Sequence, residues 1–231
     1  MIVAFTNSKG GVGKSTLAVH LAVWWQSQGA RLALIDADVQ GSSSAWAAEA
    51  SPELRVFRLQ SPDEVLEQVP ALQRQFDHLV VDGPAGLSEV TRAILLVTDV
   101  AFLPCGPSVL DLRAANDAIR VVKQAQQIRR GPPRAVLVPN KLQVQYRLSQ
   151  EMLEATRSLA IPTANGLRLR QAYADAAGQV PGRPRRRVPV AAVARAAGRP
   201  PPRATRGGWH PTGSPSTWLA PSPRLLPPAR M

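Results

Sequence analysis

The chain has 231 residues, a length typical of one or two domains, and 45% of them are hydrophobic, enough for a sizeable core. No run of 18 or more apolar residues occurs, which excludes a transmembrane helix, and the N-terminus lacks the basic start of a signal peptide. The single cysteine, Cys105, excludes a disulfide framework and a multi-cysteine metal site within one chain. A cytoplasmic location is therefore expected.

The net charge of +12 is divided unevenly along the chain. Residues 1–178 hold 18 basic and 16 acidic side chains, a net charge of +2. Residues 179–231 hold 10 arginines, no acidic residue and 12 of the 22 prolines, a net charge of +10. This predicts a nearly neutral folded domain followed by a disordered basic tail, because the tail cannot bury enough apolar surface to offset its loss of chain entropy.

The origin of the tail is open. Its bias toward Arg, Pro, Ala and Gly resembles translation of GC-rich DNA in the wrong frame, so one hypothesis is that the native C-terminal element is replaced after residue 178. Whatever its origin, a flexible segment with ten arginines and no acidic residue is expected to bind DNA phosphates without regard to sequence.

Short apolar segments alternate with longer amphipathic ones along residues 1–178, which is the pattern of a mostly parallel sheet flanked by helices. Several of the short segments are continuously apolar, as strands buried on both faces should be. The expected fold class is therefore α/β. The predicted strands are 2–6, 31–36, 55–59, 79–82, 100–105 and 134–139.

Helix signals lie between these strands. Apolar residues recur at helical spacing over residues 17–25, and Gly29 is placed to end that helix. Residues 61–64, Ser-Pro-Asp-Glu, combine an N-cap, a proline at the first helical position and a capping-box glutamate. Ser108 is placed to begin a further helix.

The strongest functional signal follows the first predicted strand and opens a helix, the context that a phosphate-binding loop requires. Its glycines allow the backbone to curl so that N–H groups face phosphate oxygens, and the helix N-terminus adds a favourable dipole. Lys14 is placed to bind the β- and γ-phosphates, and the Ser15 hydroxyl can bind Mg²⁺. The predicted loop is Lys9-Gly10-Gly11-Val12-Gly13-Lys14-Ser15-Thr16, with nucleotide contacts from Gly10 to Thr16.

This loop resembles the deviant Walker A motif, KGGxGK[S/T], of the ParA/MinD family of P-loop ATPases. The general phosphate-loop pattern has glycine where this chain has Ser8, and a second lysine, Lys9, stands beside it. The resemblance covers about residues 1–178 and implies ATP and Mg²⁺ as cofactors, ATP hydrolysis, and a face-to-face homodimer over two nucleotides. It also implies that Lys9 reaches across that dimer to the partner's phosphates.

Two further segments resemble the same family, in the same order. Residues 36–42 match D-x-D-x-Q-x-[NS], which implies that Asp36 lies near Mg²⁺ and that Asp38 orients the attacking water. Residues 78–84 resemble a Walker B strand, which implies that Asp82 holds the magnesium shell through water. Each acidic residue ends a predicted strand, where ligands bind in open α/β sheets.

Other assignments leave alternatives open. Asn140 ends the last predicted strand and is interpreted as the contact to the adenine edge, with a plain turn as the alternative. Two groups of basic residues either bind DNA phosphates or form solvated helix faces. The first group is Arg113, Arg120, Lys123, Arg129, Arg130 and Arg134, and the second is Arg168 and Arg170.

The expected function is a partition or positioning ATPase that dimerises on ATP, binds nucleoid DNA and hydrolyses ATP when a small ParB/ParG-like adaptor stimulates it. Short plasmid-partition ParA proteins are the nearest resemblance, because the phosphate loop begins at residue 9 and no separate N-terminal DNA-binding domain is expected. Two alternatives remain. One is a MinD-like membrane-associated ATPase, for which residues 188–197 form a poor amphipathic helix, and the other is a defective member with a truncated fold.

Overall fold

A computed structural model describes residues 1–143, 145–156, 159 and 161–169. The predicted domain boundary at residue 178, the tail 179–231 and the segment 188–197 lie outside this part of the chain. Between residues 1 and 169, no described helix is long and apolar enough to cross a membrane.

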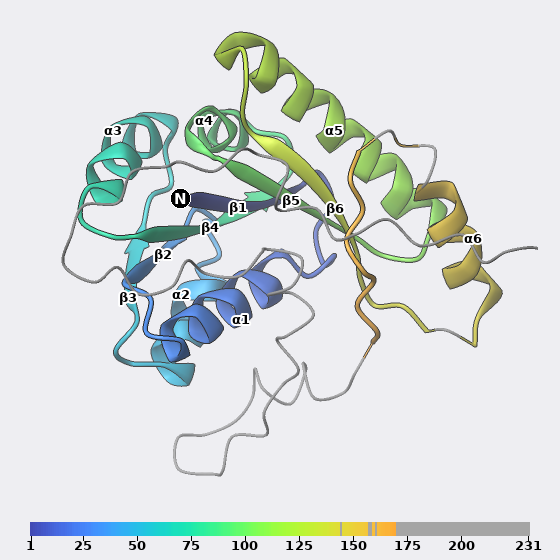
Figure 1. Cartoon of the computed structure of the whole chain (residues 1–231), viewed down its shortest axis with the longest axis horizontal. Coiled ribbons are helices and arrows are strands. Elements are labelled where there is room, and N and C mark those ends of the chain that lie inside the picture. The colour runs from blue at the N-terminus through green and yellow to red at the C-terminus, as the bar shows by residue number, and fades with distance from the viewer. Residues whose placement is uncertain (144, 157–158, 160, 170–231) are drawn as a thin grey trace, which may run out of the picture. The chain divides into compact units, whose positions relative to one another are not determined.

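Strands and helices alternate along the described chain, as the sequence predicts. All strand pairings are parallel, and one sheet has the order β3-β2-β4-β1-β5-β6 (Figure 1). This confirms the α/β fold class. The elements are β1 (Ile2–Asn7), α1 (Lys14–Ser27), β2 (Leu32–Asp36), α2 (Ser42–Ala50), β3 (Arg55–Arg58), α3 (Pro62–Gln73), β4 (His78–Ala85), α4 (Glu89–Val97), β5 (Val100–Cys105), α5 (Val109–Arg129), β6 (Arg134–Pro139) and α6 (Arg147–Thr156).

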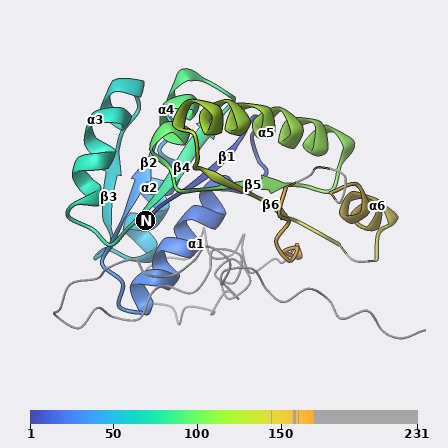
Figure 2. The same ribbon diagram turned by 45° about the horizontal axis from the view of Figure 1, so that its top comes forward.

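Helices cover both faces of the sheet. Helices α1 and α2 lie on one face, and α3, α4 and α5 lie on the other (Figures 1 and 2). On the first face, Trp25, Phe5 and Phe102 belong to one buried cluster. The Phe5 and Phe102 rings stack with their centroids 5.3 Å apart. On the second face, Leu103 and Ile119 belong to a separate buried cluster. Because both faces are covered, the central strands are continuously apolar.

The helix signals read from the sequence are confirmed. Helix α1 ends at Ser27, and Gly29 follows in the left-handed region with φ +83°. At α3, the Glu64 N–H donates to the Ser61 hydroxyl and the Ser61 N–H donates to the Glu64 carboxylate, which completes the capping box. At α5, the Ser108 hydroxyl accepts from the Asp111 N–H.

Strand β4 runs further than predicted and continues past Asp82 to Ala85. It keeps pairing with β1 beyond an irregularity in register between Phe5 and Asn7. Gly83 lies so close to β1 that a Cβ on it would stand 2.9 Å from the Phe5 carbonyl oxygen, so no side chain fits there. The end of β4 therefore lies directly against the strand that leads into the phosphate loop.

After β6 the chain returns alongside that strand, which the sequence analysis did not predict. The Leu137 N–H donates to the Pro162 carbonyl (2.9 Å), and the Ala164 N–H donates to the Leu137 carbonyl (2.8 Å). Further along, Leu142 and Arg168 form an isolated parallel bridge. This segment protects the β6 edge of the sheet over part of its length.

Candidate functional site: the phosphate loop and the strand ends beside it

The carboxyl ends of β1, β2 and β4 meet at one edge of the sheet, and the predicted acidic residues meet there too. Asp82 is the register partner of Asp36 in β2 and of Phe5 in β1, and both carboxylates are fully buried. Lys14 begins α1 directly after the loop that leaves β1. The structure therefore brings together, at the edge where α/β sheets bind ligands, residues that are far apart in the sequence.

Two glycines give the phosphate loop its path. Gly11 (φ +71°) and Gly13 (φ +100°) adopt the left-handed conformation that favours glycine. A Cβ on Gly13 would also collide with the Asn140 amide. Gly10 has no such constraint, because a Cβ there would make only an ordinary 3.8 Å contact with Ala85. The curl expected of the loop thus rests on Gly11 and Gly13.

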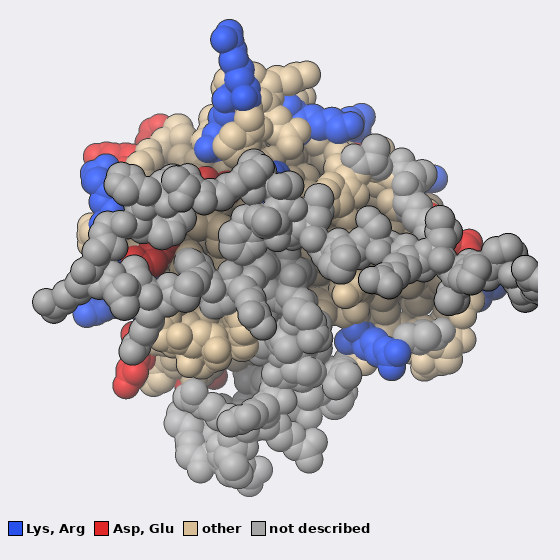
Figure 3. Space-filling model, viewed as in Figure 1, with Lys and Arg blue, Asp and Glu red and all other residues tan. Residues whose placement is uncertain are grey.

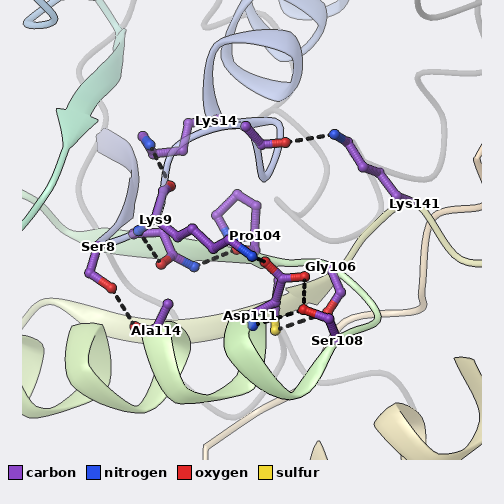
Figure 4. A network of polar contacts seen from close by, with 12 residues as sticks. Ser8, Lys9, Lys14, Pro104, Gly106, Ser108, Asp111, Ala114 and Lys141 are labelled. Carbon is purple, nitrogen blue, oxygen red and sulfur yellow. Dashed lines mark hydrogen bonds and ion pairs between the residues drawn. The ribbon is translucent and has the colours of Figure 1, made fainter. Parts of the chain in front are cut away.

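Side-chain hydrogen bonds fix the beginning of the loop onto β5 and α5 (Figure 4). The Asn7 amide donates to the Pro104 carbonyl (2.6 Å) and accepts from the Lys9 N–H (3.1 Å). The Ser8 hydroxyl donates to the Ala114 carbonyl (3.0 Å). Ser8, which stands where the general pattern has glycine, therefore anchors the loop to helix α5.

Lys14 is buried, with 6% of its surface exposed, and its ammonium donates to the Lys9 carbonyl (3.1 Å). Burial lowers the pKa of Lys14, and the charges of Asp82 and Asp38 oppose that shift. Among the described residues, no carboxylate forms an ion pair with it. Its charge is thus left for an anion at the start of α1, where the helix dipole also favours one.

Asp82 is a buried carboxylate whose two oxygens have no hydrogen-bond partner in the described part of the chain. Burial raises its pKa to about 7, although the nearby hydroxyls of Ser15 and Ser43 and the charge of Lys14 act to lower it. The Ser43 hydroxyl likewise has no partner within hydrogen-bonding geometry. Such unsatisfied groups are costly in a protein interior unless a ligand or water completes them.

These groups fit a magnesium site of the phosphate-loop kind. The hydroxyl of Ser15 and the bare oxygens of Asp82 lie at the loop and offer the oxygen ligands that Mg²⁺ prefers. No cluster of three His, Cys, Asp or Glu side chains that could hold a metal occurs among the described residues. Ser15 and Asp82 would therefore hold Mg²⁺ together with phosphate and water oxygens.

The Asp36 carboxylate organises the loop that follows β2. Its Oδ2 accepts from the N–H (2.8 Å) and the hydroxyl (2.6 Å) of Ser44, and its Oδ1 accepts from the Asp38 N–H (3.1 Å). Asp38 is half-buried, and its Oδ1 accepts from the Gln40 N–H (3.0 Å). The role of Asp36 beside Mg²⁺ and that of Asp38 toward water stay predictions.

Lys9 is bound to a partner that the sequence analysis missed. Its ammonium forms a 2.7 Å ion pair with Asp111, whose other oxygen accepts a 2.5 Å hydrogen bond from the Ser108 hydroxyl. Figure 4 shows the Lys9 side chain extending to the start of α5, away from the Lys14 ammonium. The Lys9 ammonium is therefore not placed beside Lys14 to bind the phosphates of its own chain. In the sequence, Asp111 stands three residues after Ser108, which is typical of a helix start and does not reveal a partner for Lys9.

Asn140 and Lys141 hold the phosphate loop from the end of β6. The Asn140 amide donates to the Val12 carbonyl (2.9 Å), and the Lys141 ammonium donates to the Gly11 carbonyl (2.6 Å). The Asn140 side-chain oxygen accepts from the Lys141 N–H (2.9 Å). Contact between Asn140 and adenine stays a prediction, and Lys141 is a contact residue that the sequence did not reveal.

The predicted basic cluster on α5 is divided by the structure. The Arg129 guanidinium donates to the carbonyls of Thr98 and Leu95 and so closes the end of α4. The Arg120 side chain pairs with Asp117 but remains 70% exposed. Figure 3 shows Lys and Arg side chains that project from the edge of the molecule where α5 lies. The exposed members are Arg113, Arg120, Lys123, Arg130, Arg134 and, in the second group, Arg168, whereas Arg170 lies outside the described residues.

Two other predicted positions are Cys105 and Thr16. Cys105 is buried in β5, and burial, with the charge of Asp111 acting in the same direction, raises its pKa to about 12, which agrees with an inert strand residue. The Thr16 carbonyl, in the first turn of α1, is hydrogen-bonded to His20 Nδ1 (2.7 Å). A nucleotide contact from Thr16 stays a prediction.

Residues 3–179 match the family described as the CobQ/CobB/MinD/ParA nucleotide binding domain. The chain belongs to this family. A similar curated protein is the maintenance of carboxysome distribution protein A of Halothiobacillus neapolitanus, 29% identical over 181 residues that cover 75% of this chain and 82% of the relative. Another is the septum site-determining protein MinD of Bacillus subtilis, 23% identical over 58% of this chain and 63% of the relative.

Solved structures share the fold. The apo form of McdA from Cyanothece superposes with a TM-score of 0.69 at 15% identity, over 85% of this chain and 99% of that one. A McdA–ATP complex from Cyanothece gives 0.67 at 15% identity, over 77% and 86%. Cobyrinic acid a,c-diamide synthase from Mycobacterium smegmatis with ADP and magnesium gives 0.58 at 20% identity, over 71% and 84%. The family is described as nucleotide-binding, and solved structures of this fold contain ATP, or ADP with magnesium, in agreement with the predicted cofactors ATP and Mg²⁺.

The buried Asp82 carboxyl predicts a pH-dependent stability in the absence of nucleotide. Its pKa is about 7 in the folded chain against 3.8 as the ordinary value, so between these pH values the folded state binds the extra proton. The free energy of unfolding therefore falls as the pH rises from about 4 to 7. Asp82→Asn should flatten this profile and raise the free energy of unfolding at pH 8 by roughly 2–4 kcal/mol.

Urea unfolding of the nucleotide-free protein at a series of pH values measures this effect. Asp117→Asn, at a half-exposed surface ion pair, is the control and should keep the wild-type profile. An Asp82→Asn protein with the wild-type pH profile would show that the buried carboxyl is compensated in solution.

Proposed function

We propose that the chain is an ATPase of the ParA/MinD kind, which binds ATP with Mg²⁺, closes into a homodimer and positions a cargo in the cell. The observation that carries the proposal is the pair of lysines in one loop. Lys14 is buried at the start of α1 with no carboxylate counterion among residues that the structure describes, whereas Lys9 points outward to α5 with 40% of its side chain exposed. One lysine can bind the phosphates of its own chain, and the other remains available to a second chain.

Hydrolysis in this proposal depends on residues at the strand ends. Mg²⁺, when bound, offsets the charge of the β- and γ-phosphates. Lys14 binds the same phosphates, and Ser15 and Asp82 hold the ion with its waters. Asp38 orients the water that attacks, a role that phosphoryl transfer to water requires of some side chain. The chain is thus proposed to be an ATP hydrolase with Lys9, Lys14 and Asp38 as its catalytic residues.

The Lys9–Asp111 ion pair must break before the proposed homodimer can form, which adds to the free energy of dimerisation. Before Lys9 can contact the phosphates of a second chain it must leave Asp111, which also accepts from Ser108. The Lys9 side chain is 40% exposed and that of Asp111 only 12%, so water screens this pair only in part. The phosphates of ATP carry more negative charge than one carboxylate, so bound ATP can replace Asp111 as the partner of Lys9. The pair therefore keeps the lysine in place in the monomer without preventing dimerisation.

DNA is proposed as the surface to which the protein binds, and a small ParB/ParG-like protein is the proposed adaptor. The exposed basic residues of α5 and the ten arginines of the tail both favour phosphate contacts, which would associate the protein with the nucleoid. The similarity to a protein that maintains carboxysome distribution favours a large protein assembly as cargo over a plasmid. The particular assembly is a further question for gene neighbourhood and pull-down experiments.

Lys9→Ala tests the homodimer. The variant should still bind ATP, because Lys14 is intact, but it should lose the ATP-dependent dimer and hydrolysis. Asp111→Asn is the matched variant, since it removes the charge that pairs with Lys9 while its amide oxygen can still accept from the Ser108 hydroxyl, and it should dimerise with ATP at least as well as wild type. Sedimentation velocity with and without Mg²⁺-ATP and a phosphate-release assay give the result. A Lys9→Ala protein that dimerises normally with ATP contradicts the proposal.

The salt dependence of DNA binding tests the proposal that the protein binds DNA. Each phosphate contact adds about 0.9 to the slope of log affinity against log salt, so the full chain should show a slope of roughly 4–8. A chain that ends at Gly178 should show a smaller slope, from the α5 residues alone, while its affinity for Mg²⁺-ATP stays unchanged. Equal slopes for the two chains would mean that the DNA contacts lie entirely within residues 1–178. A slope near zero for both would contradict DNA as the surface that the protein binds.

A further inference from the structure

The loop that carries Asp38 is a tight turn, which the Asp36 carboxylate holds at its start by accepting from the Asp38 N–H and which hydrogen bonds to Asp38 close. The Gly41 N–H donates to the Asp38 carbonyl (3.0 Å), and the Gln40 N–H donates to Asp38 Oδ1 (3.0 Å). Gly41 adopts φ +64° and begins helix α2 without a side-chain cap. Val39, in the middle of the turn, is 68% exposed, so its side chain does not pack in the core.

Two side chains from the end of the neighbouring edge strand hold the turn from outside. The Arg58 guanidinium donates to the Val39 carbonyl (3.2 Å). The same guanidinium covers Gly41, where a Cβ would lie 3.1 Å from its nearest nitrogen. The Gln60 amide donates to the Asp38 carbonyl (3.4 Å), a longer contact. Arg58 thus makes the shorter and more extensive of the two contacts.

The register of the sheet explains why Arg58 reaches this turn. Arg58 and Asp36 are partners in the parallel pairing of β3 with β2, and the Leu59 N–H donates to the Asp36 carbonyl (3.1 Å). The long side chain of Arg58 therefore starts level with the end of β2 and extends along the loop that leaves it. A planar guanidinium can donate a hydrogen bond and cover a glycine at the same time, which an ammonium group cannot do.

From these contacts we propose that Arg58 is a positioning residue for hydrolysis, which acts by fixing the turn that presents Asp38. The inference rests on the proposed ATPase function, in which Asp38 orients the attacking water. Small displacements of a water-orienting group cost much of the rate, since about 1 Å of misplacement lowers rates by about 100-fold. Arg58 contacts neither the phosphate loop nor the buried carboxylates among its described contacts, so it should affect the rate of hydrolysis and not the binding of ATP.

Arg58 is also a position where a substitution should leave the fold intact. Its side chain is exposed, and it lines an open hollow of about 730 Å³ between α2 and β3 together with Arg55. Removing the guanidinium therefore creates no cavity in the core. Arg55 lies on the same strand and is also exposed, but its described contacts do not include the Asp38 turn, which makes it the matched control.

The test compares Arg58→Met, Arg58→Lys and Arg55→Met with wild type and with Asp38→Ala. Single-turnover hydrolysis of bound ATP should be about 10-fold slower in Arg58→Met, partly restored in Arg58→Lys and unchanged in Arg55→Met. The dissociation constant of a fluorescent ATP analogue and the unfolding midpoint should stay within twofold and within a few degrees of wild type. Asp38→Ala sets the rate expected without the water-orienting group.

Hydrogen exchange keeps the inference testable without turnover. The Gln40 and Gly41 amides, which the turn protects, should exchange at least about 10-fold faster in Arg58→Met than in wild type or Arg55→Met. Unchanged exchange, or a slowed rate that is matched by an equal loss of ATP affinity, overturns the role of Arg58. A wild-type protein that binds ATP without hydrolysing it contradicts the proposed function as well, whereas normal hydrolysis in Arg58→Met contradicts only the role of Arg58.

Discussion

The constraint on which the rest of this site depends is the burial of opposite charges that do not pair with each other. Lys14 is buried at the start of α1, and within the described part of the chain its ammonium donates only to a loop carbonyl. Asp82 is buried at the end of β4 with both oxygens unpartnered among the described residues. Burial lowers the pKa of the lysine and raises that of the carboxyl, so each is driven toward its neutral form. An anion beside the lysine and a cation beside the carboxyl complete such a site, and Mg²⁺-ATP supplies both.

The sheet makes this arrangement possible. The carboxyl ends of three parallel strands meet at one edge of the sheet, and the close approach of β4 to β1 at Gly83 leaves no room for a side chain between them. The phosphate loop is then fixed at its start, by Ser8 on helix α5, and in its middle, by Asn140 and Lys141 directly after β6. A loop held in this way keeps its backbone oriented toward phosphate before any ligand is bound, which lowers the cost of binding.

Much of this could be predicted from the sequence because the signals are local. The strand alternation, the phosphate loop and the caps at Ser61 and Ser108 are each encoded within a few residues, and the structure agrees with them. The contacts that tune the site are not local. Asp111 meets Lys9, Lys141 meets Gly11, and Arg58 meets Val39 only because the parallel sheet sets distant segments side by side. The spacing of residues within one segment cannot predict such pairs. Likewise, the basic residues of α5 looked alike in sequence, but Arg129 alone among them closes the end of α4.

The central claim is that a buried lysine in a preformed loop binds the phosphates of ATP, and a calorimetric titration tests it most directly. Mg²⁺-ATP should be titrated into wild type, Lys14→Ala and Lys123→Ala, the last replacing an exposed lysine of α5 as control. The account predicts that Lys123→Ala binds as wild type does, whereas Lys14→Ala shows no measurable binding, because the phosphates lose their main cationic partner. An unchanged affinity in a folded Lys14→Ala protein would contradict it.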